Sequence, residues 1–437
     1  MTPAAGHTAA LAQLSAEPTP APAAIARAPR RLLAFVGPGY LVAVGYMDPG
    51  NWATSIAAGS AFGYTLLWVV LVSSLMAMLF QHLSARLGLA SGLTLAQACR
   101  RHYSKRTATA LWVGAEIAIC ACDLAEVIGA AIALKLLFGL PLSIGILVTV
   151  ADVFLILLLL DRGARAVEAL IMGMVCLIGA SFAYNLWLAA PAPMAVLHGF
   201  LPGPQILSEA EMLLLAVGIV GATVMPHNLY LHSALVQRRQ SGACAAPPRA
   251  MIRYATWDSC IALTVALAIN CAILILAAAA FNAKGHTGVV ELEQAHRLLA
   301  PLLGAAGAGA AFAIALLCAG VASTFTGTLA GQVVMEGFLN LRIPAWLRRL
   351  TTRLIALAPA LLVTLYLGEE HTARLLVLSQ VVLSLQLPFA LFPLIRFTAA
   401  KSVMGDLAAP RAITLAAWTG AGLIVSLNLA MLWRLAT

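Results

Sequence analysis

Two short segments of the chain combine helix-breaking residues with side chains that can bind a cation. The first, GYMDPGNW (residues 45–52), contains Asp48 and Asn51, and the second, ATVMPHN (residues 222–228), contains Met225. Carboxylate and amide oxygens bind many divalent cations, whereas a thioether sulfur favours softer ions than Mg²⁺ or Ca²⁺. The combination therefore favours Mn²⁺, Fe²⁺ or later first-row ions such as Co²⁺ and Zn²⁺, with Cd²⁺ as the expected soft competitor.

Each segment also frees backbone carbonyl groups. Pro49 and Pro226 have no N–H to donate to the residue four positions earlier, so the carbonyls of Gly45 and Ala222 lose their helical partners. Exposed backbone at membrane depth is tolerated only where it is buried in protein or lines a cavity. Both helices are therefore predicted to open, and the freed carbonyls become candidate ligands.

Asp48 and Met225 each have a simpler interpretation. An aspartate directly before a proline is a common N-cap, so Asp48 could merely start the second half of its helix. A single methionine in an apolar helix is usually a packing residue. The cost of a charge inside a membrane favours a functional role for Asp48, and capping is compatible with that role. The position of Met225 directly before Pro226 favours a ligand.

The composition places these segments in a membrane. Of the 437 residues, 62% are hydrophobic and 10% are charged, and the mean hydropathy is +0.94, far above that of a soluble domain. A span needs roughly 20 apolar residues. Eleven spans are predicted, at about 33–58, 64–86, 107–137, 141–160, 166–190, 212–237, 254–281, 303–331, 350–368, 374–396 and 412–434.

The net charge of +9 reflects membrane topology. Lys and Arg cluster before the first predicted span and then in every second loop, which predicts a cytoplasmic N-terminus and an extracytoplasmic C-terminus. The chain is thus expected to be a multi-pass protein of a bacterial inner (plasma) membrane, in contact with lipid and with no nucleic-acid partner. It is also expected to be a monomer.

The two interrupted spans divide the chain into similar halves. Residues 1–26 are expected to be a disordered cytoplasmic tail, and residues 27–434 a single transmembrane transporter domain. Spans one to five (about 33–190) and six to ten (about 212–396) read as two inverted repeats, with an extra helix at about 412–434. Transporters with inverted repeats place their substrate at discontinuous helices in corresponding positions of the two halves.

Further polar residues lie within the predicted spans. Glu116, Asp123 and Glu126 share one face of the third span, because they are seven and three residues apart. They could carry protons, or form a buried salt-bridge network with arginines at the start of the ninth span that only fixes helix packing. Single polar residues in other spans are normally hydrogen-bonded packing residues. They are His227, His232, Gln380 and Gln386, and the span-nine arginines are Arg348, Arg349 and Arg353.

MDPGNW together with MPHNLYLHS resembles the Nramp family of proton-coupled divalent metal transporters, whose bacterial members take up manganese and iron. CDLAEVIGAA (122–131) and LVLSQVVLSLQLPFAL (376–391) extend the resemblance over essentially the whole chain after the tail. It implies an all-α, LeuT-like fold with helices 1 and 6 unwound at mid-membrane. It also implies metal coordination by Asp48, Asn51, the Ala222 carbonyl and Met225, with Gln380 joining in some states.

The resemblance further implies a proton pathway. Asp123, Glu126 and a span-nine arginine, Arg348 or Arg349, would form the exit path, and His227 would serve coupling and gating without binding metal. His232 is a weaker candidate for the same role. We therefore expect alternating access, in which Mn²⁺ or Fe²⁺ is the substrate, H⁺ is the co-substrate and no cofactor is needed.

Three other functions remain as alternatives. A Na⁺- or H⁺-coupled symporter of amino acids or other organic substrates could share this fold, although Asp48 would repel a substrate carboxylate. An intramembrane metal-dependent enzyme is disfavoured, because the chain has no HExxH motif and no nucleophile beside a base. A passive channel would be expected to have rings of pore-lining residues rather than a compact site.

Overall fold

The computed structural model describes residues 37–151, 164–240, 247–341, 343–366 and 368–436. Within these ranges the regular elements are all helical, and nine helices are long and apolar enough to cross a membrane. The predicted disordered tail, residues 1–26, lies outside the described residues.

The first half of the chain contains α3 (Pro38–Gly45), α4 (Pro49–Phe62), α5 (Leu67–Ser91), α6 (Leu95–His102), α7 (Lys105–Phe138), α8 (Leu142–Val148), α10 (Ala164–Ala189) and α11 (Pro193–Gly199). The second half contains η1 (Pro204–Leu207), α12 (Ala210–Val224), α13 (Pro226–Gln240), α14 (Pro248–Ala280), η2 (Asn282–Lys284) and α15 (Leu292–Leu303). It continues with α16 (Gly307–Leu339), α17 (Ala345–Tyr366), η3 (Glu369–His371), α18 (Thr372–Ala399), α19 (Lys401–Met404), η4 (Gly405–Leu407) and α20 (Arg411–Ala436).

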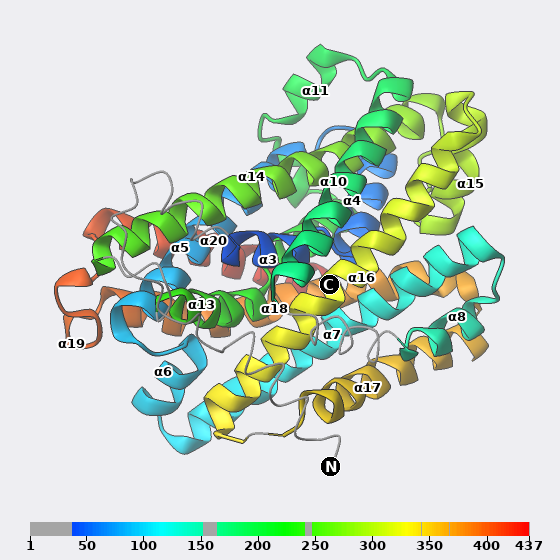
Figure 1. The fold of residues 1–437 in the computed structure, drawn as a ribbon. Helices are drawn as coiled ribbons and strands as arrows, with labels where there is room; N and C mark the ends of the chain where they lie inside the picture. Colours follow the sequence, from blue (N-terminus) through cyan, green and yellow to red (C-terminus); the bar gives the residue numbers. More distant parts are fainter. Residues whose placement is uncertain (1–36, 152–163, 241–246, 342, 367, 437) are drawn as a thin grey trace, which may run out of the picture.

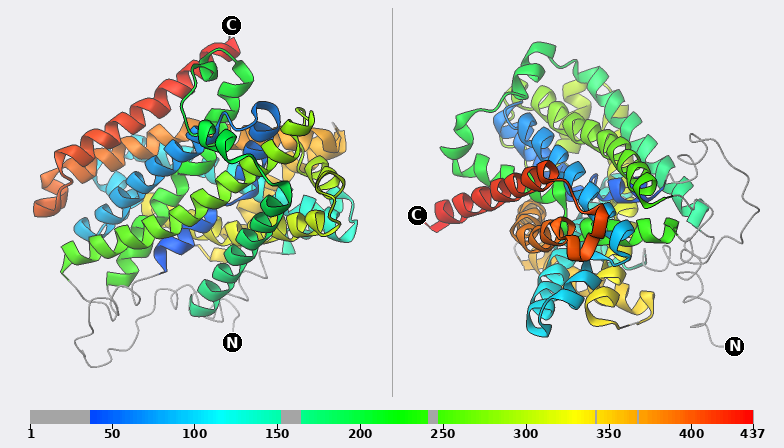
Figure 2. Two further views of the ribbon diagram at one scale, coloured as in Figure 1. Left: turned by 90° about the horizontal axis from the view of Figure 1, so that it is seen from above. Right: turned by 90° about the vertical axis from the view of Figure 1, so that its left-hand side faces the viewer.

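The long helices form one bundle around the two interrupted helices. The short helices α6 and α19 lie at one end of the bundle, and α8 and α15 lie at the other (Figure 1). Helix α7 packs against α16, α17 and α18, whereas α14 packs against α3, α4 and α5. Helix α20 runs along the edge of the bundle in both further views (Figure 2).

Both predicted breaks are present. The first helix ends at Gly45 and resumes at Pro49, and the sixth ends at Val224 and resumes at Pro226. Each second half begins at a proline, where the missing N–H costs nothing because the first N–H groups of a helix have no internal partner. The unwound residues lie inside the bundle, since Tyr46, Met47 and Met225 are buried.

The start of α3 is fixed to α14. The backbone N–H of Gly39 donates to Asp258 Oδ2 at 2.7 Å, and the side chain of Asp258 is buried. A Cβ atom on Gly39 would lie 2.7 Å from the carbonyl carbon of Asp258 and 2.8 Å from the nitrogen of Ser259. Glycine at position 39 therefore allows two helix backbones to approach more closely than any other residue would.

Eleven spans are predicted and nine are found in the described part of the chain, and two of the predicted spans account for the difference. The first predicted span, 33–58, is divided into α3 and α4 of 8 and 14 residues, so neither half is long enough alone. The fourth, 141–160, begins with α8 but continues into residues 152–163, which lie outside the described residues. Several helices are longer than predicted, because they extend past the apolar stretch; α16 ends at Leu339 rather than at 331.

Helix α15 was not predicted, because it is too short and too polar to be a span. Its buried residues Leu292, Ala295 and Leu299 recur every three or four positions, which is the pattern of an amphipathic helix lying on a surface. It is tied to the bundle through Glu293, which lies 2.6 Å from Lys135 Nζ and also pairs with Arg297. Burial raises the pKa of Glu293, but the hydrogen bonds from these two cations outweigh it and hold that pKa below its ordinary value of 4.5.

Candidate functional site

Asp48 caps α4 and still has one oxygen to offer. Its Oδ1 accepts hydrogen bonds from the backbone N–H of Asn51 at 3.0 Å and from Asn51 Nδ2 at 2.9 Å. Its Oδ2 is buried and has no hydrogen-bond partner among the described residues. A buried polar atom without a partner is costly, so Oδ2 is a candidate position for a cation or a water molecule. Capping accounts for one carboxylate oxygen and leaves the other available.

The side chain of Asn51 joins the two interrupted helices. Its Nδ2 group donates to Asp48 Oδ1 and also to the carbonyl oxygen of Ala222 at 2.8 Å. Three of the predicted ligand residues therefore meet at one point between α4 and α12. The amide orientation follows from the hydrogen bonding, because the opposite orientation would place three acceptor oxygens against one another.

Met225 occupies the break between α12 and α13 in a strained conformation. Its φ is 41° and its ψ is 100°, in the left-handed range that non-glycine residues rarely adopt. Such a conformation costs of order 1–3 kcal/mol and persists where the surroundings enforce it. The side chain is fully buried, and its sulfur accepts a hydrogen bond from Asn228 Nδ2 at 3.4 Å.

Gln380 reaches the same region from α18. A Cβ atom on Gly50 would overlap the side-chain amide of Gln380, so the amide lies directly against the first turn of α4. Gln380 Nε2 donates to Ser379 Oγ at 2.9 Å, and its buried Oε1 has no hydrogen-bond partner in the described part of the chain. The structure thus brings all five predicted metal-ligand residues to the two breaks.

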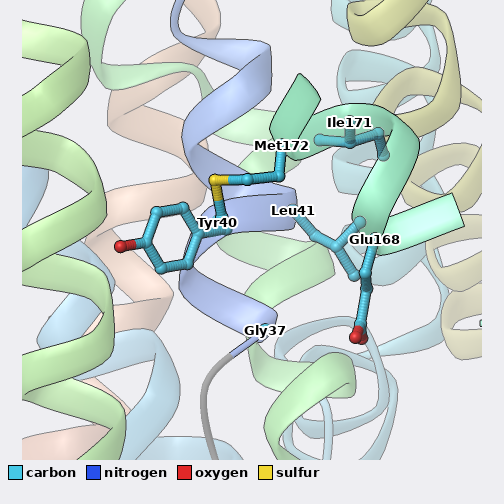
Figure 3. A pocket seen from close by; sticks show the side chains of 6 residues that line it. All are labelled: Gly37, Tyr40, Leu41, Glu168, Ile171 and Met172. Atoms are coloured by element: carbon cyan, nitrogen blue, oxygen red, sulfur yellow. The ribbon is translucent and has the colours of Figure 1, made fainter. Parts of the chain in front are cut away.

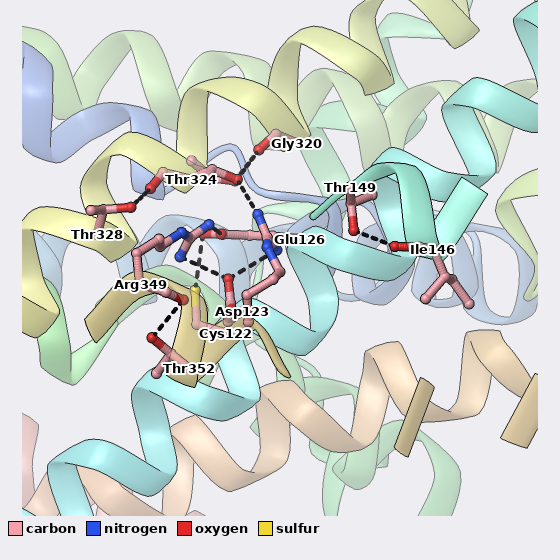
Figure 4. Close-up of polar contacts among 12 residues, drawn as sticks. Cys122, Asp123, Glu126, Ile146, Thr149, Gly320, Thr324, Thr328, Arg349 and Thr352 are labelled. Carbon is pink, nitrogen blue, oxygen red and sulfur yellow. Dashed lines mark hydrogen bonds and ion pairs between the residues drawn. The ribbon is translucent and has the colours of Figure 1, made fainter. Parts of the chain in front are cut away.

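Three of the predicted proton-pathway residues, Asp123, Glu126 and Arg349, lie in a buried ionic cluster between α7 and α17 (Figure 4). Asp123 Oδ1 lies 2.8 Å from Arg349 Nη1 and 3.0 Å from Arg353 Nη1, and Glu126 Oε2 lies 3.5 Å from Arg349 Nη2. Arg348 is not part of this cluster, because its side chain turns to Glu116, 2.8 Å away. We predicted Arg348 or Arg349 for this role, whereas the structure places Arg349 and Arg353 beside Asp123.

The two predicted histidines have different surroundings. His232 Nδ1 lies 2.8 Å from Gln81 Oε1, and Gln81 Nε2 donates to the hydroxyl of Tyr46 at 2.8 Å. Both ring nitrogens of His227 are buried without a hydrogen-bond partner among the described residues. His232 therefore belongs to a polar chain that ends next to the first break, and His227 does not.

Sequence reasoning missed the side chains that satisfy the unwound backbone. Asn270 Nδ2 donates to the carbonyl of Tyr46 at 2.9 Å, and the indole N–H of Trp52 donates to the carbonyl of Met47 at 3.1 Å. The only signal for Asn270 was a single amide in an apolar span. A tryptophan gives no such signal, because its ring packs equally well in an apolar core.

A cavity of about 90 Å³ lies beside α3 and is separate from the two breaks. It is lined by Gly37, the residue before α3, by Tyr40 and Leu41 of α3, and by Glu168, Ile171 and Met172 of α10. The sulfur of Met172 points toward the Tyr40 ring, and the Glu168 carboxylate points away from it (Figure 3). The cavity thus leaves room between α3 and α10.

The profile of the Nramp family, described as "Natural resistance-associated macrophage protein-like", matches residues 39–434. The chain belongs to the Nramp family. It is 59% identical over 406 residues to the "Divalent metal cation transporter MntH" of Xanthomonas campestris pv. campestris, covering 93% of this chain and 91% of the relative. The predicted family is therefore confirmed, and because the curated relatives are named transporters, this Nramp protein is a transporter rather than an enzyme.

Solved structures confirm the predicted fold of this Nramp protein. A crystal structure of the Eremococcus coleocola manganese transporter superposes with a TM-score of 0.83 at 39% identity, covering 94% of this chain and 88% of that chain. Mhp1, a nucleobase-cation-symport-1 family transporter, superposes with a TM-score of 0.60 at 15% identity, covering 91% of each chain. The second likeness shows the LeuT-like fold alone. The division into repeats at 33–190 and 212–396 stays a prediction.

Proposed function

We propose that this Nramp protein imports divalent transition-metal ions, Mn²⁺ or Fe²⁺, together with protons by alternating access. The observation that carries the proposal is the buried Oδ2 of Asp48, which has no hydrogen-bond partner in the part of the chain that the structure describes and lies where the two interrupted helices meet. Relatives named as divalent metal cation transporters and a structural neighbour named as a manganese transporter support it.

The metal ligands in this proposal are Asp48, Asn51, the Ala222 carbonyl and Met225, with Gln380 as an additional oxygen donor. An ion between Asp48 and Ala222 requires the Asn51 amide to rotate, so that its oxygen replaces the N–H₂ group that now joins them. The single negative charge and the oxygen atoms suit any divalent cation, and the sulfur of Met225 favours transition metals over Mg²⁺ and Ca²⁺.

The proton route in this proposal runs from Asp48 to Asp123 and Glu126 on α7. Packing of α4 against α7 and the burial of both carboxylates support this route. Arg349 and Arg353 supply the positive charge that lets the carboxylates exist in the interior. A negative-inside membrane potential would assist each inward-moving positive charge by about 2.3 kcal/mol per 100 mV.

The direction of transport rests on which end of the bundle faces the cytoplasm. The end that carries α6 and α19 is rich in basic residues, including Arg100, Arg101 and Lys401, and this asymmetry supports a cytoplasmic location. On the α4 side of the first break, the Trp52 ring packs edge-to-face against Phe182 and Phe312, with ring centroids 4.7 and 5.3 Å apart. From the basic-residue asymmetry, we propose that the protein lies in the inner membrane with the N-terminal end of α3 facing the cytoplasm.

The proposal is tested by Mn²⁺ uptake into proteoliposomes with and without an inward pH gradient and excess Mg²⁺. Asp48→Ala is expected to abolish uptake, whereas Met225→Ala should retain binding but admit Mg²⁺ or Ca²⁺ as competitors. Accumulation against the Mn²⁺ gradient would separate a transporter from a channel. Uptake that is indifferent to both substitutions would refute the metal site, and uptake indifferent to the pH gradient would refute proton coupling alone.

A further inference from the structure

Asn228 lies in the first turn of α13 and holds Met225 in two ways. Its backbone N–H donates to the carbonyl of Met225 at 3.2 Å, and its side-chain Nδ2 donates to the sulfur of Met225 at 3.4 Å. The side chain is completely buried. The amide thus fixes both the strained backbone and the end of the side chain.

The carboxamide of Asn228 is itself held in place by α3. A Cβ atom on Gly45 would lie 2.5 Å from Asn228 Nδ2 and 3.3 Å from Oδ1, so the amide packs directly over the Gly45 backbone. Gly45 is the last residue of α3. The contact therefore joins the end of the first half-helix to the sulfur at the second break.

We infer that Asn228 is a positioning residue that directs the Met225 sulfur and thereby sets the preference for soft divalent ions. This inference rests on the metal site proposed above. A methionine side chain has three rotatable bonds and adapts readily to its surroundings, whereas a metal site requires ligands placed to within about 0.5 Å. A thioether sulfur has two lone pairs; an N–H donor that occupies one leaves the other to point at the ion.

The expected size of the effect follows from other metal sites. Groups that hydrogen-bond to a ligand, without touching the metal, typically change metal affinity by about 10–100-fold when removed. Because Asn228 acts through sulfur, its loss should weaken binding of the sulfur-preferring Cd²⁺ by about tenfold and leave binding of Ca²⁺ nearly unchanged. The Cd²⁺/Ca²⁺ affinity ratio is thus the diagnostic quantity.

The rival role for Asn228 is that of a direct ligand. Its Oδ1 is buried and has no hydrogen-bond partner in the described ranges, so it could bind an ion itself. A direct oxygen ligand would contribute to Ca²⁺ binding as much as to Cd²⁺ binding, and it would do so whether or not the sulfur is present. The two roles therefore differ in a double-mutant cycle.

The experiment measures Cd²⁺ and Ca²⁺ affinities by calorimetry on the full chain in detergent, for wild type, Asn228→Leu, Met225→Ala and the double variant. Leucine preserves the branched shape of asparagine and removes the donor; Asn228→Ala provides a second variant if the leucine form fails to fold. The matched control is Asn185→Ala, which removes a buried amide whose Nδ2 donates to the Ser181 carbonyl of its own helix.

We expect Asn228→Leu to lower the Cd²⁺/Ca²⁺ affinity ratio about tenfold. The same substitution should cause no further change in the ratio when Met225 is already alanine. Asn185→Ala should retain the wild-type ratio. Equal losses for both ions, or an effect that persists without the sulfur, would overturn the inference. If Met225→Ala itself leaves the ratio unchanged, the proposed metal site fails instead. If Met225→Ala shifts the ratio and Asn228→Leu does not, only the role of Asn228 fails.

Discussion

Replacing Gly39 by alanine would separate two helices whose backbones touch. The new Cβ would lie 2.7–2.8 Å from backbone atoms of Asp258 and Ser259, which cannot turn aside as a side chain could. Ordinary contact between carbon atoms begins at about 3.5 Å, so α3 must move away from α14 by about 0.8 Å. The 2.7 Å hydrogen bond from Gly39 N–H to Asp258 would then stretch to the limit of a hydrogen bond.

The structure also gives the direction in which α3 can move. Leu41, two residues after Gly39, lies about 200° around the helix from it, so its face is nearly opposite. Leu41 lines the 90 Å³ cavity between α3 and α10, together with Met172. The displaced helix is therefore expected to move into this cavity, and shortening Met172 should give it more room.

Overpacking of this kind typically costs about 1–3 kcal/mol. We expect Gly39→Ala to lower the thermal unfolding midpoint in detergent. We also expect it to reduce Mn²⁺ uptake by about tenfold, which corresponds to about 1.4 kcal/mol of that cost falling on the arrangement of α3 and α4 that transports the ion. The double variant Gly39→Ala with Met172→Ala should recover part of the lost thermal stability and part of the lost Mn²⁺ uptake.

The control is Gly173→Ala on α10, where an added Cβ would meet nothing within 4 Å. It should leave uptake unchanged and raise stability slightly, since alanine favours a helix over glycine by about 0.5–1 kcal/mol. A Gly39→Ala protein with wild-type stability and uptake would refute the close contact. A loss that Met172→Ala fails to relieve, or deepens, would refute the direction of movement.

Two further predictions concern ion pairs. Arg349→Ala leaves buried carboxylates with one cation fewer and should cost about 3–5 kcal/mol of stability, whereas Arg348→Ala, whose partner Glu116 is partly exposed, should cost about 1 kcal/mol or less. Unfolding midpoints of both variants decide this, and equal losses would contradict the placement of the arginines. The lowered pKa of Glu293 means that its pairing with Lys135 stabilises the fold above the ordinary carboxyl pKa and is lost as the pH falls through the lowered value. Wild type should therefore be more stable than Glu293→Gln at pH 6, with the difference vanishing in strong acid; a difference that grows as the pH falls would contradict this sign.

The sequence predicts the breaks because their cause is local. Pro49 and Pro226 each remove a helical hydrogen bond beside polar residues, and the apolar stretches around them fix the approximate bounds of the spans. Proline alone does not end a helix, because Pro388 and Pro393 lie inside the continuous helix α18. The proposed ligands Asp48, Asn51 and Met225 come from the same segments, whereas Gln380 on α18 has no comparable local signal. The proline positions and residue types thus carry most of the candidate site.

The partners across helices could not be predicted in the same way. Arg348, Arg349 and Arg353 are all plausible partners for carboxylates on the third span, and only the rotation of α17 against α7 decides which of them faces Asp123. That rotation depends on packing along the whole helix pair rather than on any local pattern. The amide of Asn270 is likewise uninformative until the fold places it opposite the Tyr46 carbonyl.

The side chains that donate to carbonyl groups at the breaks differ in a way that bears on the proposed metal site. The Tyr46 carbonyl accepts a hydrogen bond from Asn270 on α14, and the Met47 carbonyl accepts one from Trp52 on α4. The Ala222 carbonyl accepts instead from Asn51, whose amide also has an oxygen that rotation about its side chain can present in place of the N–H₂ group. Asn270 is also an amide, but Asn51 Nδ2 donates to Asp48 Oδ1 as well as to Ala222, so one rotation of the Asn51 amide would turn its oxygen toward both groups. In the proposed site, a cation would therefore take the place of the Asn51 N–H₂ group between Asp48 and Ala222, while the Tyr46 and Met47 carbonyls keep their donors.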